Sequence, residues 1–355
     1  MSNRRTSADQ DRRLNGRVEN NVARRGFAAI AILLATLSAT CVTQADSGPS
    51  RESDRQSLDD AWWTGPLLAA GAASLPQGHW LFEPYFFDIK TYAHYDESGK
   101  RRDVVDHSFS GSQSYLLYGL TDNLTVGVIP RFGYNDVASG RNSTSIRVGD
   151  FTVQAGYQLT RYHEGGWTPT MSLVVQETLP IGKYDRLGDR VGDGVGGGAY
   201  STTIELHSQY YFWMPSGRIL RSRLNLSYST SNAASLEDVS VYGTDEGFRG
   251  RAEPGDSWTI TSAWEYNATR HWVLAMDVYY QHDANTRVHG VVPNHAGSVD
   301  PFEANSGSSH RIGIAPAIEY NWSSSVGVIA GFRWVAKGRN VDATIAPIVA
   351  INYVH

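Results

Sequence analysis

The 355-residue sequence has a single cysteine, Cys41, and charged residues make up only 19% of it. One cysteine excludes an internal disulfide framework. The formal net charge of −5 provides no basic surface, so we expect no nucleic-acid partner. Long apolar runs are also scarce: in the sequence, only residues 26–45 approach the length of a membrane-spanning helix. The sequence is therefore neither that of a disulfide scaffold nor that of a helical membrane bundle.

The apolar run at residues 26–45 follows two arginines and ends on the small-residue motif TQA. A basic region, an apolar region and a small-residue exit are the parts of a secretory signal peptide. We therefore predict that residues 1–45 are a leader that is removed on export. A retained membrane anchor, a twin-arginine signal and a lipoprotein signal at Cys41 are the alternatives.

From about residue 79 onward, apolar and polar residues alternate. In DFTVQAGYQLTR, for example, Phe151 and Val153 alternate with Thr152 and Gln154. A period of two predicts strands with one apolar and one polar face. About twelve such strands are predicted, at residues 79–92, 107–120, 123–135, 148–162, 168–181, 199–213, 218–231, 256–268, 271–283, 309–322, 325–336 and 342–355.

The connections between the predicted strands alternate in length. Short turns fall at TDN, HEGGW, MPSG, NATR and NWSSS, and long loops fall near 93–106, 136–147, 182–198, 232–255 and 284–308. Long strands joined in this way are typical of outer-membrane barrels. We therefore predict an all-β fold over residues 79–355: a transmembrane antiparallel up-and-down β-barrel with short periplasmic turns and long outer loops. Its place would be the outer membrane of a Gram-negative bacterium, with outer-membrane lipid against its apolar face.

The alternation also predicts which charged residues face the lumen. If the apolar face of each strand meets lipid, nine charged residues point inward: Arg131, Glu205, Arg221, Arg223, Glu265, Asp277, Arg311, Glu319 and Arg333. Glu177 falls on the lipid parity, so we expect a bulge in its strand. Asp88 and Lys90 also fall there, near the outer rim, where the penalty is small. The inward charges either line a permeation path or brace a narrow lumen.

Residues 46–78 precede the first predicted strand. They are polar at first and then become apolar and rich in glycine. We expect either a periplasmic tail or a plug in the lumen, and we favour the tail.

Several phrases resemble the outer-membrane proteins of the meta-pathway phenol-degradation family, which are described as transporter-like. They are SLPQGHWLFEPYFF, YLLYGLTDNLTVGVIP, GDFTVQAGYQL and LPIGKYDRLGDRVGDGVGGG, together with Tyr353 near the end. The resemblance runs from Leu75 onward. It implies an outer-membrane barrel that admits hydrophobic or aromatic compounds. Such barrels typically end on Phe, which the barrel-assembly machinery reads; this chain has His355 there, so we expect less efficient assembly.

Two groups of residues in the long loop at 182–198 resemble known ligand-binding motifs, but the surrounding sequence does not fit those motifs. Gly192, Gly194 and Gly197 match a dinucleotide fingerprint, which requires a buried strand before it and a helix after it. Here an alternating strand follows, so we expect a turn or flexible loop instead. Asp185, Asp189 and Asp193 could bind calcium, but their spacing is not that of an EF-hand. The loop could also fold into the lumen.

No other cofactor or catalytic motif is evident. His282, His289 and His295 share no zinc-site spacing, and we predict no metal and no cofactor. We predict a non-enzymatic barrel for passive passage of a small-molecule solute. One alternative is a lipid hydrolase with an outward His-x-Ser pair, a motif absent from the sequence; His207 and Ser208 are adjacent and so face opposite sides. The other alternative is a closed structural or adhesive barrel.

Overall fold

The computed structural model describes residues 55–294 and 298–355. The predicted leader (1–45), residues 46–54 and His295 lie outside the described residues. No helix in the described part of the chain is long and apolar enough to cross a membrane.

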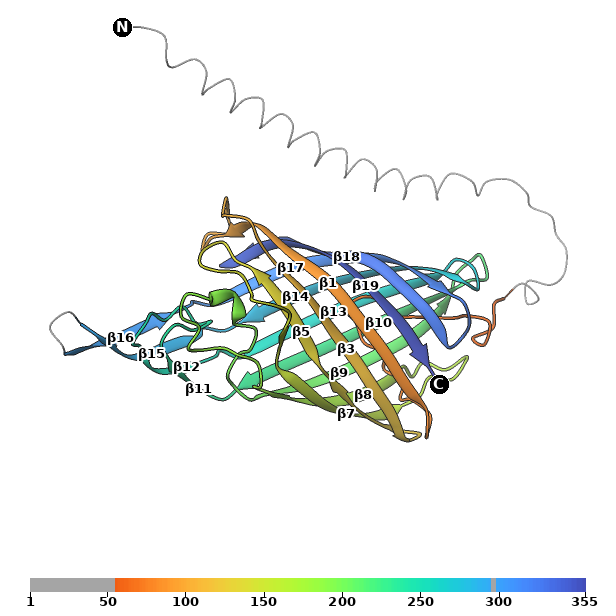
Figure 1. Ribbon diagram of the computed structural model, residues 1–355. Helices are drawn as coiled ribbons and strands as arrows, with labels where there is room; N and C mark the ends of the chain where they lie inside the picture. Colours follow the sequence, from red (N-terminus) through yellow and green to blue (C-terminus); the bar gives the residue numbers. More distant parts are fainter. Residues whose placement is uncertain (1–54, 295–297) are drawn as a thin grey trace, which may run out of the picture. The chain divides into compact units, whose positions relative to one another are not determined.

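Twelve antiparallel strands close into a barrel, as the alternation predicts (Figure 1). The strands are β1 (Trp80–Tyr95), β3 (His107–Thr121), β4 (Leu124–Ile129) continued by β5 (Arg131–Asp136), β7 (Phe151–Thr160), β8 (Thr170–Leu179), β9 (Ser201–Trp213), β10 (Ile219–Ser231), β13 (Ser257–Asn267), β14 (Trp272–Asp283), β17 (Ser309–Asn321), β18 (Val326–Arg339) and β19 (Val341–Val354). The predicted strand at 123–135 is divided by Pro130, which has no N–H for the ladder.

Pairing of the first strand with the last closes the barrel. β1 pairs with β3 on one side and with β19 on the other, from Leu81 opposite Val354 to Tyr95 opposite Val341. Trp80 and His355 exchange both backbone hydrogen bonds at 2.9 Å. Closure leaves these strands without an unpaired edge, which is the condition for a sheet in an apolar solvent.

Short connections gather at one end of the barrel and long ones at the other, as predicted. We call these the short-turn end and the long-loop end. At the long-loop end the structure adds a sheet that the sequence did not predict, made of β11 (Ala234–Glu237), β12 (Arg249–Glu253), β15 (Arg287–Pro293) and β16 (Val299–Asn305). Phe248, fully buried, packs edge-on against Phe302 at 5.3 Å in its core. The short strands β2 (Arg101–Arg102) and β6 (Arg147–Val148) and the 3-10 turn η1 (Val191–Asp193) complete the long-loop end.

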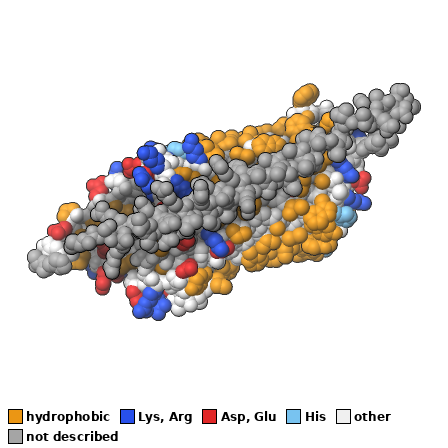
Figure 2. Space-filling view, turned by 90° about the horizontal axis from the view of Figure 1, so that it is seen from above, with side chains coloured by type: hydrophobic (Ala, Val, Ile, Leu, Met, Phe, Trp, Pro, Cys, Tyr) orange, Lys and Arg blue, Asp and Glu red, His pale blue; other side chains and the backbone are white. Residues whose placement is uncertain are grey.

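The outer face of the barrel is apolar. Large exposed side chains such as Phe82, Leu226 and Val349 lie on the predicted outward parity. On the face seen in Figure 2, hydrophobic side chains cover a broad area, and charged side chains gather toward the two ends. Glu177 also lies on the outward parity, where it accepts a hydrogen bond from Thr202 Oγ1 at 2.6 Å. The bulge expected in the strand of Glu177 is wrong. The register shift of the β7–β8 pair, between Gln158 and Thr160, places its extra residue on β7, and the β8–β9 register is unbroken.

Candidate functional site

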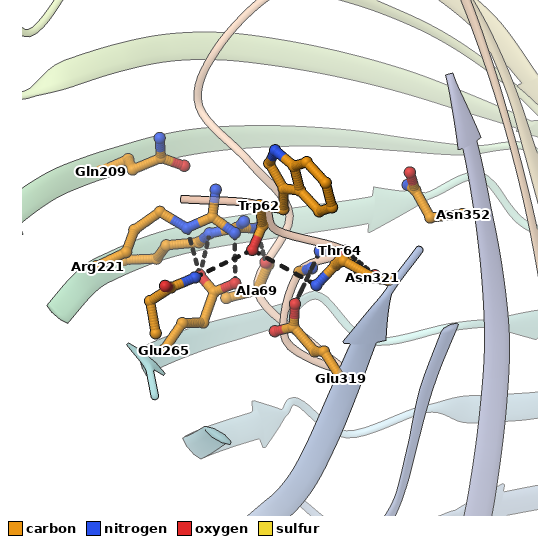
Figure 3. A network of polar contacts seen from close by, with 12 residues as sticks. Trp62, Thr64, Ala69, Gln209, Arg221, Glu265, Glu319, Asn321 and Asn352 are labelled. Carbon is orange, nitrogen blue, oxygen red and sulfur yellow. Dashed lines mark hydrogen bonds and ion pairs between the residues drawn. The ribbon is translucent and has the colours of Figure 1, made fainter. Parts of the chain in front are cut away.

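Residues 55–78 run as coil through the interior of the barrel before β1 begins, and we call them the inner segment. The backbone of this segment forms hydrogen bonds with inward-facing side chains of several strands (Figure 3). Leu67 packs in a buried cluster with Ala275 on β14, Ala315 on β17 and Ile329 on β18. Of the two expectations for this stretch, these contacts favour the one inside the lumen.

Two buried carboxylates bind the backbone of the inner segment. Glu319 Oε2 on β17 accepts the N–H groups of Thr64 at 2.7 Å and Gly65 at 3.2 Å. Asp277 on the adjacent strand β14 accepts the N–H groups of Leu67 at 3.1 Å and Ala69 at 3.0 Å, one on each oxygen. A coil inside a barrel has no ladder partners of its own, so these carboxylates satisfy amides that would otherwise be buried unpaired.

Two arginines on β10 and one glutamate on β13 form a buried ion-pair group beside these carboxylates. Arg221 Nε donates to Glu265 Oε2 at 2.7 Å, and its Nη2 donates to Oε1. Arg223 Nε lies 3.0 Å from Glu265 Oε2, and its Nη1 donates to the carbonyl oxygen of Ala69 at 2.7 Å. The Arg221 guanidinium also lies over the Trp63 ring, 4.3 Å from its centroid. The group thus joins the wall to the inner segment.

The start of the inner segment is fixed at the short-turn end. Gln56 donates from its backbone N–H to the carbonyl oxygen of Gly217 at 3.0 Å, and it accepts from Trp213 Nε1 at 2.8 Å. Its side-chain oxygen accepts from the N–H of Ile219 at 3.2 Å. These contacts place the start of the segment beside the turn between β9 and β10.

The end of the inner segment bonds to β4 and β7. The N–H of Ser74 donates to Gln158 Oε1 at 3.0 Å, and that of Leu75 donates to Thr125 Oγ1 at 2.9 Å. The segment therefore crosses the lumen from the β9–β10 side to the β4–β7 side. At its exit, Gly119 on β3 allows the close approach, since a Cβ there would lie 2.1 Å from the carbonyl oxygen of Pro76.

A cavity of about 600 Å³ lies between the inner segment and the barrel wall. Apolar and aromatic side chains line it from β1, β3, β4 and β19, among them Leu81, Tyr85, Tyr115, Leu117, Ile129 and Ile348. Amide side chains line it from β3, β7, β8, β10 and β19: Gln113, Gln154, Gln158, Gln176, Asn225 and Asn352. The cavity therefore combines an apolar surface with many neutral hydrogen-bonding groups.

Glu205 and His207 on β9 add a hydrogen-bonded carboxyl–imidazole pair to the cavity. His207 Nε2 lies 2.7 Å from Glu205 Oε2, and Ser227 Oγ on β10 donates to Glu205 Oε1 at 3.4 Å. The glutamate thus lies between the histidine and the serine. Among the described residues, no histidine forms a hydrogen bond with a serine hydroxyl, as a Ser–His–acid catalytic triad would require.

The nine charged residues predicted to face the lumen occur in three settings. Those near the inner segment are Arg221, Arg223, Glu265, Asp277 and Glu319. Arg223 also lines the cavity, together with Arg131, Glu205 and Arg333. Arg311 Nη2 donates to Asp283 Oδ2 at 2.8 Å, near the long-loop end. A role for these charges in passage of a solute stays a prediction.

Sequence reasoning missed the inward-facing amides that also bind the inner segment. Asn267 and Asn321, both nearly fully buried, donate to the carbonyl oxygen of Trp62. Asn225 Nδ2 donates to the carbonyl oxygen of Ala70 at 3.0 Å. All three lie on the inward parity of their strands, so the alternation that located the charges would also have found them.

The aspartates of the long loop do not form one site. Asp185 accepts from the N–H of Glu237, Asp189 pairs with Arg141 at 3.1 Å, and Asp193 accepts from the N–H of Thr144 at 2.8 Å. The described residues include no group of three or more His, Cys, Asp or Glu that could hold a metal ion. Of the histidines considered for zinc, His282 lies on β14 and His289 on β15.

The glycines of the same loop serve close packing. A Cβ on Gly192 would lie 2.4 Å from the N of Ser143, and one on Gly194 would lie 2.5 Å from Cγ1 of Val241. Gly197 donates to Asp150 Oδ2 at 2.7 Å. This setting is a folded outer loop rather than a strand–turn–helix, and none of the described residues that line the cavity comes from 182–198.

The fold of the barrel is similar to that of a solved outer membrane channel. An outer membrane channel from Pseudomonas putida F1 matches with a TM-score of 0.61 and 15% identity, over 81% of this chain and 98% of that channel. The β domain of the Bordetella autotransporter BrkA gives 0.42 and 10%, over 78% and 99%. The Pseudomonas putida toluene transporter TodX gives 0.36 and 13%, over 79% and 90%. The first likeness supports the fold; the other two are too distant to support an argument.

No curated protein matches the sequence. A family model does match it: the family described as the MetA-pathway of phenol degradation covers residues 85–345, from β1 to β19. This range is most of the chain and includes most of the barrel wall that forms the cavity. The resemblance inferred from the strand and turn phrases is thereby confirmed, and the chain belongs to this family.

Proposed function

We propose that the protein is an outer-membrane channel for passive passage of small, mainly apolar compounds. Its closed wall and its apolar outer band meet the two demands of a hydrocarbon solvent: paired backbone groups and an apolar surface. The long-loop end would face outward and the short-turn end would face the periplasm, as in other barrels of this kind.

The observation that carries the proposal is the cavity of about 600 Å³ inside the barrel. Small-molecule sites typically have about 300–1,000 Å³ and mix an apolar lining with a few polar groups. The rings of Tyr85 and Tyr115, 5.9 Å apart, present an aromatic surface to it. A wide polar pore for sugars or ions would instead be lined mainly by charged and solvated groups.

We further propose that the inner segment is a plug, so that passage requires its movement. Much of the inward charge is then explained: Asp277, Glu319 and Arg223 bind the plug rather than attract a solute. Such a plug would limit leakage of ions while the cavity remains available to a compound that fits it.

The proposal is tested in whole Gram-negative cells, whose lipopolysaccharide leaflet slows the entry of apolar compounds. Cells that express the protein should take up labelled toluene faster than cells without it, and labelled sucrose at an unchanged rate. The purified protein in planar bilayers should give small conductance steps or none. Faster sucrose entry with large steps would show a general pore, and no change in either solute would show a closed structural barrel.

A further inference from the structure

Two side chains in the cavity wall each have a polar atom without a partner. His207 on β9 is 4% exposed and Asn225 on β10 is 8% exposed. Both line the cavity, and they lie opposite each other in the β9–β10 ladder. Among the described residues, His207 Nδ1 and Asn225 Oδ1 have no hydrogen-bond partner. A buried polar atom left unpaired costs about 1–3 kcal/mol, so each needs a reason.

The neighbours of these residues fix the chemical character of both atoms. A carboxylate accepts hydrogen bonds, so the contact with Glu205 places the imidazole proton on Nε2. In the neutral ring, Nδ1 is then an acceptor. The bond from Asn225 Nδ2 to the carbonyl oxygen of Ala70 places Oδ1, the acceptor, on the free side. The wall therefore presents two adjacent acceptors without a donor bonded to them, within the described residues.

We propose that His207 and Asn225 form a binding site for an apolar compound that carries a hydroxyl group, such as a phenol. The hydroxyl donates to these acceptors while the carbon skeleton lies in the cavity. This inference rests on the proposed channel function and adds the class of solute. The two atoms have almost no exposed surface, and Asn225 Nδ2 is hydrogen-bonded to the carbonyl oxygen of Ala70 in the inner segment. A hydroxyl compound therefore binds as the segment around Ala70 shifts, so binding and opening are linked.

The test compares p-cresol with toluene, which differ by one hydroxyl group. Binding to the full-length refolded protein is measured by equilibrium dialysis in detergent, with empty micelles subtracted. A net hydrogen bond of about 1.4 kcal/mol corresponds to a factor of ten, so we expect p-cresol to bind roughly tenfold more tightly. A ratio near one in the wild type would overturn the proposal.

Two substitutions at one position separate the acceptor from the contact with the segment. Asn225→Leu removes both, whereas Asn225→Asp keeps an acceptor and loses the donor to Ala70. We expect the preference for p-cresol to disappear in Asn225→Leu and to persist in Asn225→Asp. If both variants lose it or both keep it, the acceptor is not the cause and the proposal fails.

Gln281→Leu is the matched control, because Gln281 lines the same cavity and bonds to Asp283, which has other partners. It should keep the tenfold ratio; loss of the ratio there would show a general effect of cavity polarity and would overturn the proposal. Folding of each variant is checked by the heat-dependent gel shift of the barrel. If cells take up toluene faster but the purified protein binds p-cresol and toluene equally, this inference alone is rejected. If the protein prefers p-cresol but cells show no faster uptake, the channel function alone is rejected.

Discussion

Arg221 and Glu265 form a two-pronged ion pair across the β10–β13 ladder, and both side chains are buried, with Glu265 fully enclosed. Arg223 shares the same carboxylate. One glutamate thus compensates two buried cations, and the group is sensitive to loss of its single anion.

Glu265→Gln is expected to destabilise the barrel strongly. It leaves two guanidinium groups buried without their anion, and breaking a buried pair typically costs about 3–5 kcal/mol. The free energy of unfolding is measured by urea titration of the protein in lipid vesicles, followed by tryptophan fluorescence. The control is Glu177→Gln, because Glu177 lies on the outer face and, among the described residues, its carboxylate accepts a hydrogen bond only from Thr202. Equal stability of the two variants would contradict a bracing role for Glu265.

Asp277→Asn is expected to loosen the inner segment. The neutral amide loses the charge that strengthens the bonds from Leu67 and Ala69, and hydrogen bonds to charged groups contribute about 1.5–3 kcal/mol each. Conductance steps in planar bilayers should become larger or more frequent than in the wild type.

Asp283→Asn is the matched control for this variant. Asp283 lies on the same strand and binds Ser257, Gln281 and Arg311, and within the described part of the chain it forms no hydrogen bond or ion pair with the inner segment. It should leave the conductance unchanged. If Asp277→Asn conducts like the wild type, the segment is not held by this carboxylate, or it does not close the path.

The sequence predicts the barrel well because lipid and lumen impose a strict period of two over long strands. The outer sheet was missed because its strands have 4–7 residues and its core joins Phe248 to Phe302, which are far apart in the sequence. The path of the inner segment could not be predicted for another reason. Carboxylates such as Glu319 bind its backbone N–H groups, and backbone donors are the same at every residue.

Gly196→Ala is expected to open the long loop between β8 and β9 without unfolding the barrel. Its new Cβ would lie 2.4 Å from the carbonyl oxygen of Gly182, and this steric clash can be relieved only if the backbone of the loop shifts. Gly197→Ala is the control, since a Cβ there meets Asp150 at an ordinary 3.5 Å. Trypsin should cleave the first variant faster at Arg186 and Arg190 and should cleave the second at the wild-type rate. Similar cleavage rates for the two variants would show that the close backbone contact between Gly182 and Gly196 does not hold the loop.

The loop contact at Asp193 is expected to fail in acid. The N–H of Thr144, which donates to its carboxylate at 2.8 Å, holds the pKa of Asp193 below the ordinary value of 3.8, and the nearby Arg147 adds to this. Because the folded pKa is lowered, the stabilisation is complete above about pH 4 and disappears as the pH falls through the folded pKa. Hydrogen exchange of residues 137–147, corrected at each pH with an unfolded reference, should therefore stay slow down to about pH 4 and rise below it. Asp193→Asn should exchange at one rate across this range; a step that persists in this variant would assign the acid sensitivity to another group.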